Sequence, residues 1–426
     1  MDIESSLNTT FTQRFLTASK LCFGSTIFTF SSTENKLLTI GTRSSLYQRI
    51  FGVRLIIALC MITLSIFQAR EYHLNHKRST SSSTSSESET SASSSFHINT
   101  LLQAMFFISC HLSFIYIGWT HLKKQREMVN LHNAMINFEH QELSVESIYQ
   151  EDREGERVCK FILQNTAMNV FAVMFGRVVA TYHYTCMPDL AGYFLLEECQ
   201  LRNDTAIEIR PSEAPETSLE AVLTPSLKLG IVFINWVQLS LFYIGFNLDI
   251  ICFTYIPSFF FNKTLRFLSR MIGIRHKNKV KKVQLLRQIQ LLLISYNDIH
   301  KRFGVVCIVG QSVVLLTICS YALIRLGDNL MPIHFIFFLA AAIQAFVTIM
   351  FVFGEMGKVY QTSEMVLEQG KKVVELQKDP WFRRVLRSWP KQKIRMGEVN
   401  YLDSLTPFNM ANFSISLTVN MLLMET

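Results

Sequence analysis

Seven apolar runs of about 20 residues constrain the fold of this chain more than any other feature of its sequence. They lie at about 51–69, 101–121, 161–182, 229–256, 304–325, 332–354 and 406–424. Each run is close to or above the length that an α-helix needs to cross a hydrocarbon core of about 30 Å. Charged residues gather between the runs, where loops meet water. The sequence therefore predicts an all-α membrane protein with seven transmembrane helices.

Composition argues against several other classes. The first fifty residues are polar and mixed, so the first apolar run starts too late to belong to a cleavable signal peptide. The nine cysteines form no CxxC pair and no cysteine–histidine cluster, so neither a metal site nor a cofactor is supported. The net charge of +8 is better explained by cytosolic loops than by nucleic acid binding.

The distribution of lysine and arginine predicts the orientation in the membrane. The N-terminal 50 residues hold five of these cations, and the loops 121–160, 257–303 and 355–405 hold six, eleven and ten. The remaining loops hold about seven in total, and the loop 183–228 also carries eight acidic residues. Because positively charged loops stay in the cytosol, we expect the N-terminus inside and the C-terminus outside.

Local features of the loops agree with this orientation. Asn203 begins a glycosylation sequon in an outside loop. Cys186 and Cys199 lie in the same loop, where they either form a disulfide or stay free. The serine-rich tract 79–95 also falls outside and is expected to be a flexible loop. The sequon at Asn262 falls inside and should be unused.

Two of the basic loops are predicted to be helical. Apolar residues at three- and four-residue spacing run through both, namely Leu285, Ile289, Leu292 and Tyr296 in the first and Met356, Val359, Met365, Val366, Val373 and Leu376 in the second. We read them as spans five and six extended into the cytosol as amphipathic helices. Packing on each other and on neighbouring subunits is favoured over lying on the inner leaflet. The predicted segments are 1–50, 51–256, 257–303, 304–354, 355–405 and 406–426.

The last span is the most polar of the seven. Asn409, Asn412, Ser416 and Asn420 recur at three- and four-residue spacing, which places them on one stripe of a helix. Such a stripe must face protein or water rather than lipid. It suits the wetted wall of a pore, and its alternative is hydrogen bonding between helices of a single chain.

The order of these parts resembles the arthropod chemoreceptor superfamily, and within it the gustatory receptor-like branch. The most specific stretch is 387–426, where Pro390, Ile394, Gly397, Tyr401 and Thr418 follow the order of the family's C-terminal pattern. The chain departs from that pattern where the family usually has Tyr after the Thr and a Gln followed by a large apolar residue at the end. These positions hold Val419, Glu425 and Thr426, which indicates a divergent member.

The resemblance implies a homo- or heterotetrameric, ligand-gated, non-selective cation channel of the plasma membrane that responds to small-molecule tastants. The last helices of four subunits then line a central pore, with Ser416, Thr418 and Asn420 on its wall. Leu422 stands where the family places an apolar constriction, and aliphatic rings can gate by dewetting. Glu425 is either a ring of four carboxylates that attracts cations at the outer mouth or a solvated terminal residue.

The resemblance also places a ligand pocket in the outer half of the helical bundle. The candidates combine apolar surface with a few polar groups, as ligand sites do. They are Phe106, Phe175, Arg177, Tyr182, Trp236, His334 and Phe338. An arginine within a span faces a pocket or an ion partner by default, although Arg177 can also snorkel outward. For each aromatic residue, simple core or interface packing is the alternative.

Other functional classes fit less well. A G-protein-coupled receptor has the opposite charge asymmetry, and the chain lacks an Asp-Arg-Tyr-like end to span three and Asn-Pro-x-x-Tyr in span seven. A secondary transporter tends to show internal repeats and helices broken by Gly or Pro at matching positions. An enzyme needs His, Asp or Cys clustered at one depth, which the sequence does not offer. A structural member of the same superfamily without ligand gating stays open.

Overall fold

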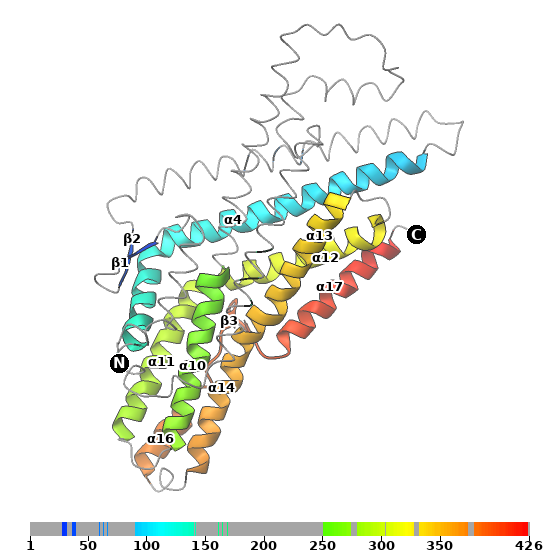
Figure 1. The fold of residues 1–426 in the computed structure, drawn as a ribbon. Helices are drawn as coiled ribbons and strands as arrows, with labels where there is room; N and C mark the ends of the chain where they lie inside the picture. The colour runs from blue at the N-terminus through cyan, green and yellow to red at the C-terminus, as the bar shows by residue number, and fades with distance from the viewer. Residues whose placement is uncertain are drawn as a thin grey trace.

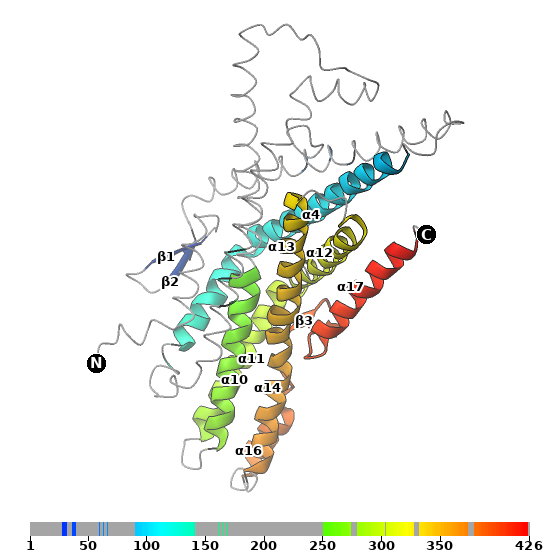
Figure 2. The same ribbon diagram turned by 45° about the vertical axis from the view of Figure 1, so that its right-hand side comes forward.

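The structure is a computed structural model of the 426-residue chain. It describes residues 28–31, 36–39, 90–139, 250–273, 279–302, 304–327, 332–373 and 379–424, with a few isolated positions elsewhere. The described part is predominantly helical (Figures 1 and 2). Two of its helices, Gly304–Arg325 and Phe335–Lys372, are long and apolar enough to cross a membrane. The predicted spans 51–69 and 161–182 and most of 229–256 lie outside the described residues, so the seven-helix topology stays a prediction.

The first long helix is α4, Thr90–Phe138, which contains the predicted span 101–121 and continues past it. It kinks at Lys124, whose φ of −113° and ψ of 21° are not helical. The Lys124 Nζ donates to the Asp298 carbonyl oxygen at 2.7 Å, which ties the kink to a later helix. Because α4 begins inside the tract 79–95, the prediction that this whole tract is a loop is wrong for its last residues. A helix nucleated in the apolar run propagates into serine and alanine, which tolerate helical geometry.

The predicted cytosolic stretch 257–303 forms two packed helices. The π-helical turn η6, Ile251–Tyr255, leads into α10, Ile256–Gly273, and α11, Lys279–His300, packs against α10. Span five follows as a separate helix, α12, Gly304–Leu326, so the expectation of one continuous helix is wrong. The break has a physical cause, because the Lys301 carbonyl oxygen accepts the Gly397 amide at 2.7 Å instead of continuing the helical ladder.

Span six does continue into a long helical rod, as expected. It consists of α13, Pro332–Val347, the π-helical turn η7, Thr348–Val352, and α14, Phe353–Lys372. Lys371 and Lys372 in the last turn of α14 suit the negative end of its helix dipole.

The chain then turns back towards the membrane helices. The short helix α16, Pro380–Ser388, begins at Asp379, whose carboxylate accepts the Trp381 and Phe382 amides. A hydrogen bond from Lys279 lowers the pKa of Asp379. The strands β3, Arg395–Met396, and β4, Asn400–Tyr401, pair antiparallel, and the last helix is α17, Thr406–Leu423. A second antiparallel pair near the N-terminus, β1, Phe28–Ser31, and β2, Lys36–Thr39, was not predicted.

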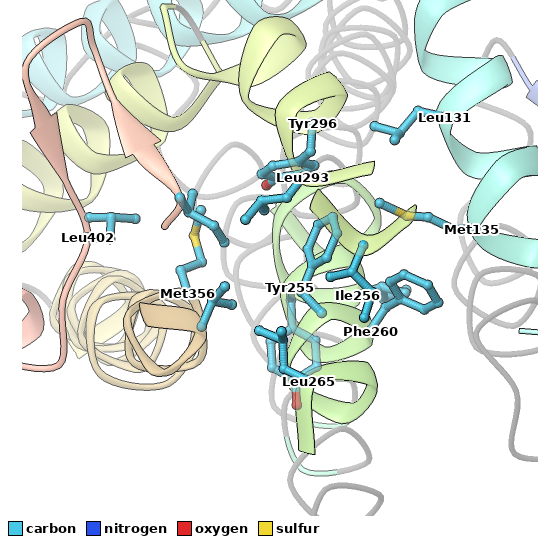
Figure 3. Close-up of a cluster of buried hydrophobic side chains, with 14 of the residues drawn as sticks. Leu131, Met135, Tyr255, Ile256, Phe260, Leu265, Leu293, Tyr296, Met356 and Leu402 are labelled. Carbon is cyan, nitrogen blue, oxygen red and sulfur yellow. The ribbon is translucent and has the colours of Figure 1, made fainter. Parts of the chain in front are cut away.

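Helices α10, α11, α14 and α16 and the segment 389–405 share one apolar core, and we call these elements together the extension bundle (Figure 3). Leu265, Tyr296, Met356 and Leu402 are fully buried in it. Each large side chain of this kind contributes about 1.5–3 kcal/mol through burial. The Tyr296 hydroxyl donates to the Phe253 carbonyl oxygen at 3.0 Å, and burial raises the pKa of Tyr296.

Most residues of the two apolar stripes predicted from the sequence face this core. Leu285, Ile289 and Tyr296 are buried, and so are Met356, Val359 and Val366, whereas Leu292 and Val373 are half-buried. Met365 is 48% exposed, so its place in the core was wrong. The reason is angular, because a residue next to Val366 is rotated by about 100° around the helix. Leu376 lies outside the described residues.

The predicted membrane part has a second core and an apolar exterior. Phe338, Ala341 and Ala345 of α13 pack against α12. Large apolar side chains of the same two helices point outward, including Ile324, Ile336, Leu339, Ile343 and Phe346. An apolar exterior of this extent is typical of a surface that meets lipid or another protein.

Candidate pore helix and its base

Helix α17 lies at the edge of the molecule and packs mainly against α12 (Figures 1 and 2). Its buried face consists of Pro407, Met410, Ser414 and Thr418, which follow each other at three- and four-residue spacing. Two of these are small polar residues whose hydroxyls are satisfied within the helix. Ser414 Oγ donates to the Met410 carbonyl oxygen at 3.1 Å, and Thr418 Oγ1 donates to that of Ser414 at 2.9 Å. Small side chains of this kind let two helices approach closely.

The opposite face of α17 carries the polar stripe. Asn409, Asn412, Ser416 and Asn420 are all exposed in the single chain. With about 100° between successive residues, Ser416 and Asn420 point roughly opposite to Ser414. Apolar residues flank this stripe and are also exposed, namely Phe408, Phe413, Ile415 and Val419. The helix thus has one face packed mainly on α12, one polar face and apolar flanks.

The predicted pore residues fall on different faces of α17. Ser416 and Asn420 lie on the polar face, whereas Thr418 is buried against α12, with its hydroxyl 3.5 Å from the Thr317 carbonyl oxygen. Leu422 is half-buried and packs against the core between α12 and α13. Leu423 is 63% exposed and continues the line of the polar stripe. The sequence already indicated that Thr418 does not share a face with Ser416 and Asn420, because residues two apart in a helix point in different directions. Glu425 lies outside the described residues.

The predicted pocket is described in only a few places. Phe338 is fully buried in α13 and meets Phe337 edge to face, with ring centroids 5.5 Å apart. The backbones of Phe106 and His334 lie in α4 and α13, but their side chains are not among those described. The rest lie outside the described residues, as do the predicted disulfide and glycan positions; these are Phe175, Arg177, Tyr182, Trp236, Cys186, Cys199 and Asn203.

A polar cluster that the sequence reasoning missed joins α4 to α12. Gln311 Oε1 accepts the hydroxyls of Ser109 at 2.7 Å and Ser113 at 2.6 Å, and Gln311 is only 3% exposed. Its Nε2 donates to the sulfur of Cys110 at 3.3 Å. The signal available in the sequence was the glutamine itself, because an amide within an apolar run needs a partner.

The base of α17 is held by one carboxylate. Asp403 Oδ1 accepts the amides of Leu405 at 3.1 Å and Thr406 at 2.8 Å, and the Thr406 hydroxyl at 2.7 Å. In return, the Asp403 amide donates to Thr406 Oγ1 at 2.9 Å. This reciprocal arrangement satisfies amides at the start of the helix, where no intrahelical acceptors exist.

The β3–β4 hairpin before this cap is fixed to the end of α11. Asn297 Oδ1 accepts the Arg395 amide at 2.8 Å, and Asn297 Nδ2 donates to the Lys393 carbonyl oxygen at 2.9 Å. Gly397 turns the hairpin with a φ of 72°, a conformation that favours glycine. Glu398 pairs with Arg302 at 2.7 Å and with Lys301 at 3.2 Å.

The same segment is fixed to α14. Gln361 Nε2 donates to Ser404 Oγ at 2.7 Å, and the Tyr360 and Tyr401 rings lie 5.3 Å apart. Next to this contact, Gly357 lies against the backbone of residues 403 and 404. The helix that is predicted to line a pore therefore begins on a well-connected platform.

The asparagine of the sequon at 262 is buried in the folded chain. Its side chain is 2% exposed and donates to the Glu355 carbonyl oxygen at 2.7 Å and to Glu355 Oε2 at 3.1 Å. A glycan cannot be attached to this amide in the folded chain. This agrees with the expectation that the sequon at Asn262 is unused.

The fold is similar to that of a solved insect olfactory receptor. The structure of the insect olfactory receptor OR5 from Machilis hrabei aligns with a TM-score of 0.51 and 12% identity, over 85% of this chain and 88% of that chain. The same receptor in complex with eugenol aligns with a TM-score of 0.57 and 11% identity, over 99% of this chain and 100% of that chain. No protein-family model and no curated protein matches the chain. At this level of identity the likeness shows the fold.

Proposed function

We propose that this chain is a gustatory receptor-like chemoreceptor that acts as a tetrameric, ligand-gated, non-selective cation channel of the plasma membrane. The observation that carries the proposal is the polar stripe of α17, which lies opposite the face that packs on α12. A helix with this arrangement needs water on its polar side and protein on its flanks. Four copies around an axis supply both, since the stripes then face a central pore and the apolar flanks face neighbouring copies.

The proposed topology follows the charge distribution. Seven helices cross the membrane, with the N-terminus in the cytosol and the C-terminus outside. The extension bundle then lies in the cytosol. The gustatory assignment rests on the C-terminal pattern of residues 387–426, and the ligand is a small-molecule tastant bound in the outer half of the helical bundle.

The proposed conduction path uses the chemistry of α17. Cations passing the helix meet the uncharged amide and hydroxyl groups of Asn409, Asn412, Ser416 and Asn420. Such groups interact with hydrated cations without binding them tightly, which suits a non-selective pore. An aliphatic ring near the outer end closes it by dewetting. Glu425 at the outer mouth attracts cations in the open state.

The proposal is tested by recording membrane current from cells that display the chain at their surface, during application of a tastant panel. We expect a cation current that appears with a compound. Ser416→Lys is expected to abolish this current at unchanged surface level, because a ring of cations on the pore wall repels cations. Ser416→Thr is the matched control and should conduct. Surface protein without current in any condition would limit the conclusion to the fold.

The position of the constriction is tested in the same cells. Leu422→Ala and Leu423→Ala each remove one aliphatic side chain from the end of α17. The variant that removes the constriction is expected to leak without ligand. Leu423 is the more exposed of the two, so a leak confined to Leu423→Ala would place the constriction on the polar face. No leak from either variant would contradict an aliphatic gate at this level.

A further inference from the structure

The rod formed by α13, η7 and α14 connects two parts of the molecule to which function is assigned. Its α13 end carries Phe338 and His334 of the predicted pocket, and its α14 part meets the base of α17. A π-helical turn, η7, interrupts the rod between them, and such turns are frequent at functional sites. The rod meets α17 directly through η7 and α14, and α14 also meets the segment at the base from which α17 starts. That base contact is therefore one route by which movement of the rod reaches the proposed pore helix.

That contact is made backbone to backbone at Gly357. A Cβ at this position would overlap the carbonyl oxygen of Asp403 and lie 2.9 Å from the Ser404 amide nitrogen. Since these are main-chain atoms, no side chain can rotate away to make room. Glycine within a helix costs about 1 kcal/mol relative to alanine, so helix stability does not explain its presence here. The close approach of the backbone at residues 403 and 404 explains why glycine occupies this position.

A second glycine of the same helix provides a direct comparison. Gly354 lies three residues earlier in α14, and a Cβ built there meets nothing within 4 Å. The two glycines share a helix and a residue type, and they differ in whether the segment that starts α17 lies against them.

Asp403 connects this contact to the pore helix. Its backbone touches Gly357, and its carboxylate binds the Leu405 and Thr406 amides at the start of α17. A shift of the backbone at residue 403 therefore moves the hydrogen-bond acceptor that fixes the first turn of the helix. Beyond this base, α17 meets its own subunit largely through α12, where small residues such as Ser414 and Thr418 lie between the two helices.

We propose that Gly357 and Asp403 are positioning residues that set the resting position of α17 and transmit movement of the α13–α14 rod to it. This inference rests on the proposed channel function. With no side chain between the two backbones, displacement of α14 is passed on to residue 403 and its carboxylate without slack. A methyl group at 357 separates the two segments and changes the angle at which α17 leaves the extension bundle.

The first test compares Gly357→Ala with Gly354→Ala in membrane-current recordings, each normalised to surface protein. We expect Gly357→Ala to change the current without ligand and to shift the half-maximal ligand concentration about fivefold or more, the lower end of typical coupling effects. Gly354→Ala should leave both close to the wild-type values, although it makes the same gain in helix propensity. Equal behaviour of the two variants would overturn the inference while leaving the channel in place.

The second test separates positioning from loss of fold. Asp403→Ala removes the acceptor, whereas Asp403→Asn retains Oδ1 for the amides. We expect the alanine variant to shift the half-maximal ligand concentration more than the asparagine variant does. The double variant Gly357→Ala/Asp403→Ala should shift it by less than the two single effects combined, because both act through the same contact. Fully additive shifts would show that the two residues act independently.

A third measurement does not depend on current. Structures of Gly357→Ala and Gly354→Ala determined by electron microscopy and aligned on α14 should differ in the position of residues 403–406 and of the first turn of α17. If the wild-type chain carries no current, the channel proposal fails and this comparison still decides the positioning claim. An unmoved segment in Gly357→Ala would refute it.

Discussion

The extension bundle and the exposed side of α17 differ in how far their side chains are buried and hydrogen-bonded within one chain. In the bundle, Phe261, Tyr296 and Leu402 are fully buried, and side chains such as Asn297 and Asp403 each make several hydrogen bonds. On α17, asparagines and large apolar residues stand exposed side by side. A single chain completes the first region by itself, whereas the second region needs water, lipid or other copies. The difference separates a region whose packing is complete within one chain from a region that leaves polar and apolar side chains exposed.

The largest expected effect comes from the core of the bundle. Phe261→Ala should lower the free energy of unfolding by about 3–5 kcal/mol, because it leaves a cavity at a fully buried position. Phe408→Ala, at a position that is 60% exposed, should change it by about 0.5 kcal/mol or less. Denaturant titration of the chain in mixed micelles measures both values.

The same pair of variants can break the comparison. If Phe408→Ala costs as much as Phe261→Ala in dissociated chains, α17 is part of the single-chain core after all. If it costs stability only where copies are assembled, the flank of α17 is a subunit contact. Cross-linking alongside the titration distinguishes the two situations.

A smaller effect is expected where the hairpin meets α11. Asn297→Ala should cost about 1–3 kcal/mol, because the Arg395 amide and the Lys393 carbonyl lose their partner. Asn297→Asp keeps the acceptor for Arg395 and loses the donor to Lys393, so it should fall between wild type and alanine. Equal losses in both variants would mean that the Lys393 bond alone matters.

The smallest effect is expected at Glu398. Hydrogen bonds from Arg302 and then Lys301 lower the pKa of this carboxyl group in the folded chain. A lowered pKa stabilises the fold above the carboxyl's unfolded-state pKa, and the stabilisation is lost as the pH falls through the folded value. The melting temperature of wild type should therefore exceed that of Glu398→Gln slightly at neutral pH, and the gap should close in acid. Added salt should also shrink it, because the pair is exposed.

The sequence predicted those features that repeat along the chain. The apolar period of Leu285, Ile289 and Tyr296 shows which face of α11 packs inward, because burial follows the helical repeat. The continuation of span six into α14 was equally visible, because Met356, Val359 and Val366 follow the helical repeat. The helical architecture was also predictable, and the fold likeness to a solved insect olfactory receptor agrees with it.

Features that depend on partners far along the chain were not predictable in this way. Asn297 binds residues almost a hundred positions later, and Gly357 is explained only by the arrival of Asp403. The break between α11 and α12 likewise depends on the Gly397 amide. Thr418 shows a different limit, because its place in a family pattern does not say which face of α17 it occupies.

The length of the α13–α14 rod makes it a lever. The apolar helix Phe335–Lys372 has 38 residues, which corresponds to roughly 55 Å at a rise of about 1.5 Å per residue. A tilt of about 1.5° around Phe335 displaces the backbone at Gln361 by roughly 1 Å, and in the direction away from Ser404 this takes the 2.7 Å bond between them out of hydrogen-bonding range. Small angular changes at one end of the rod are thus magnified where the last helix begins.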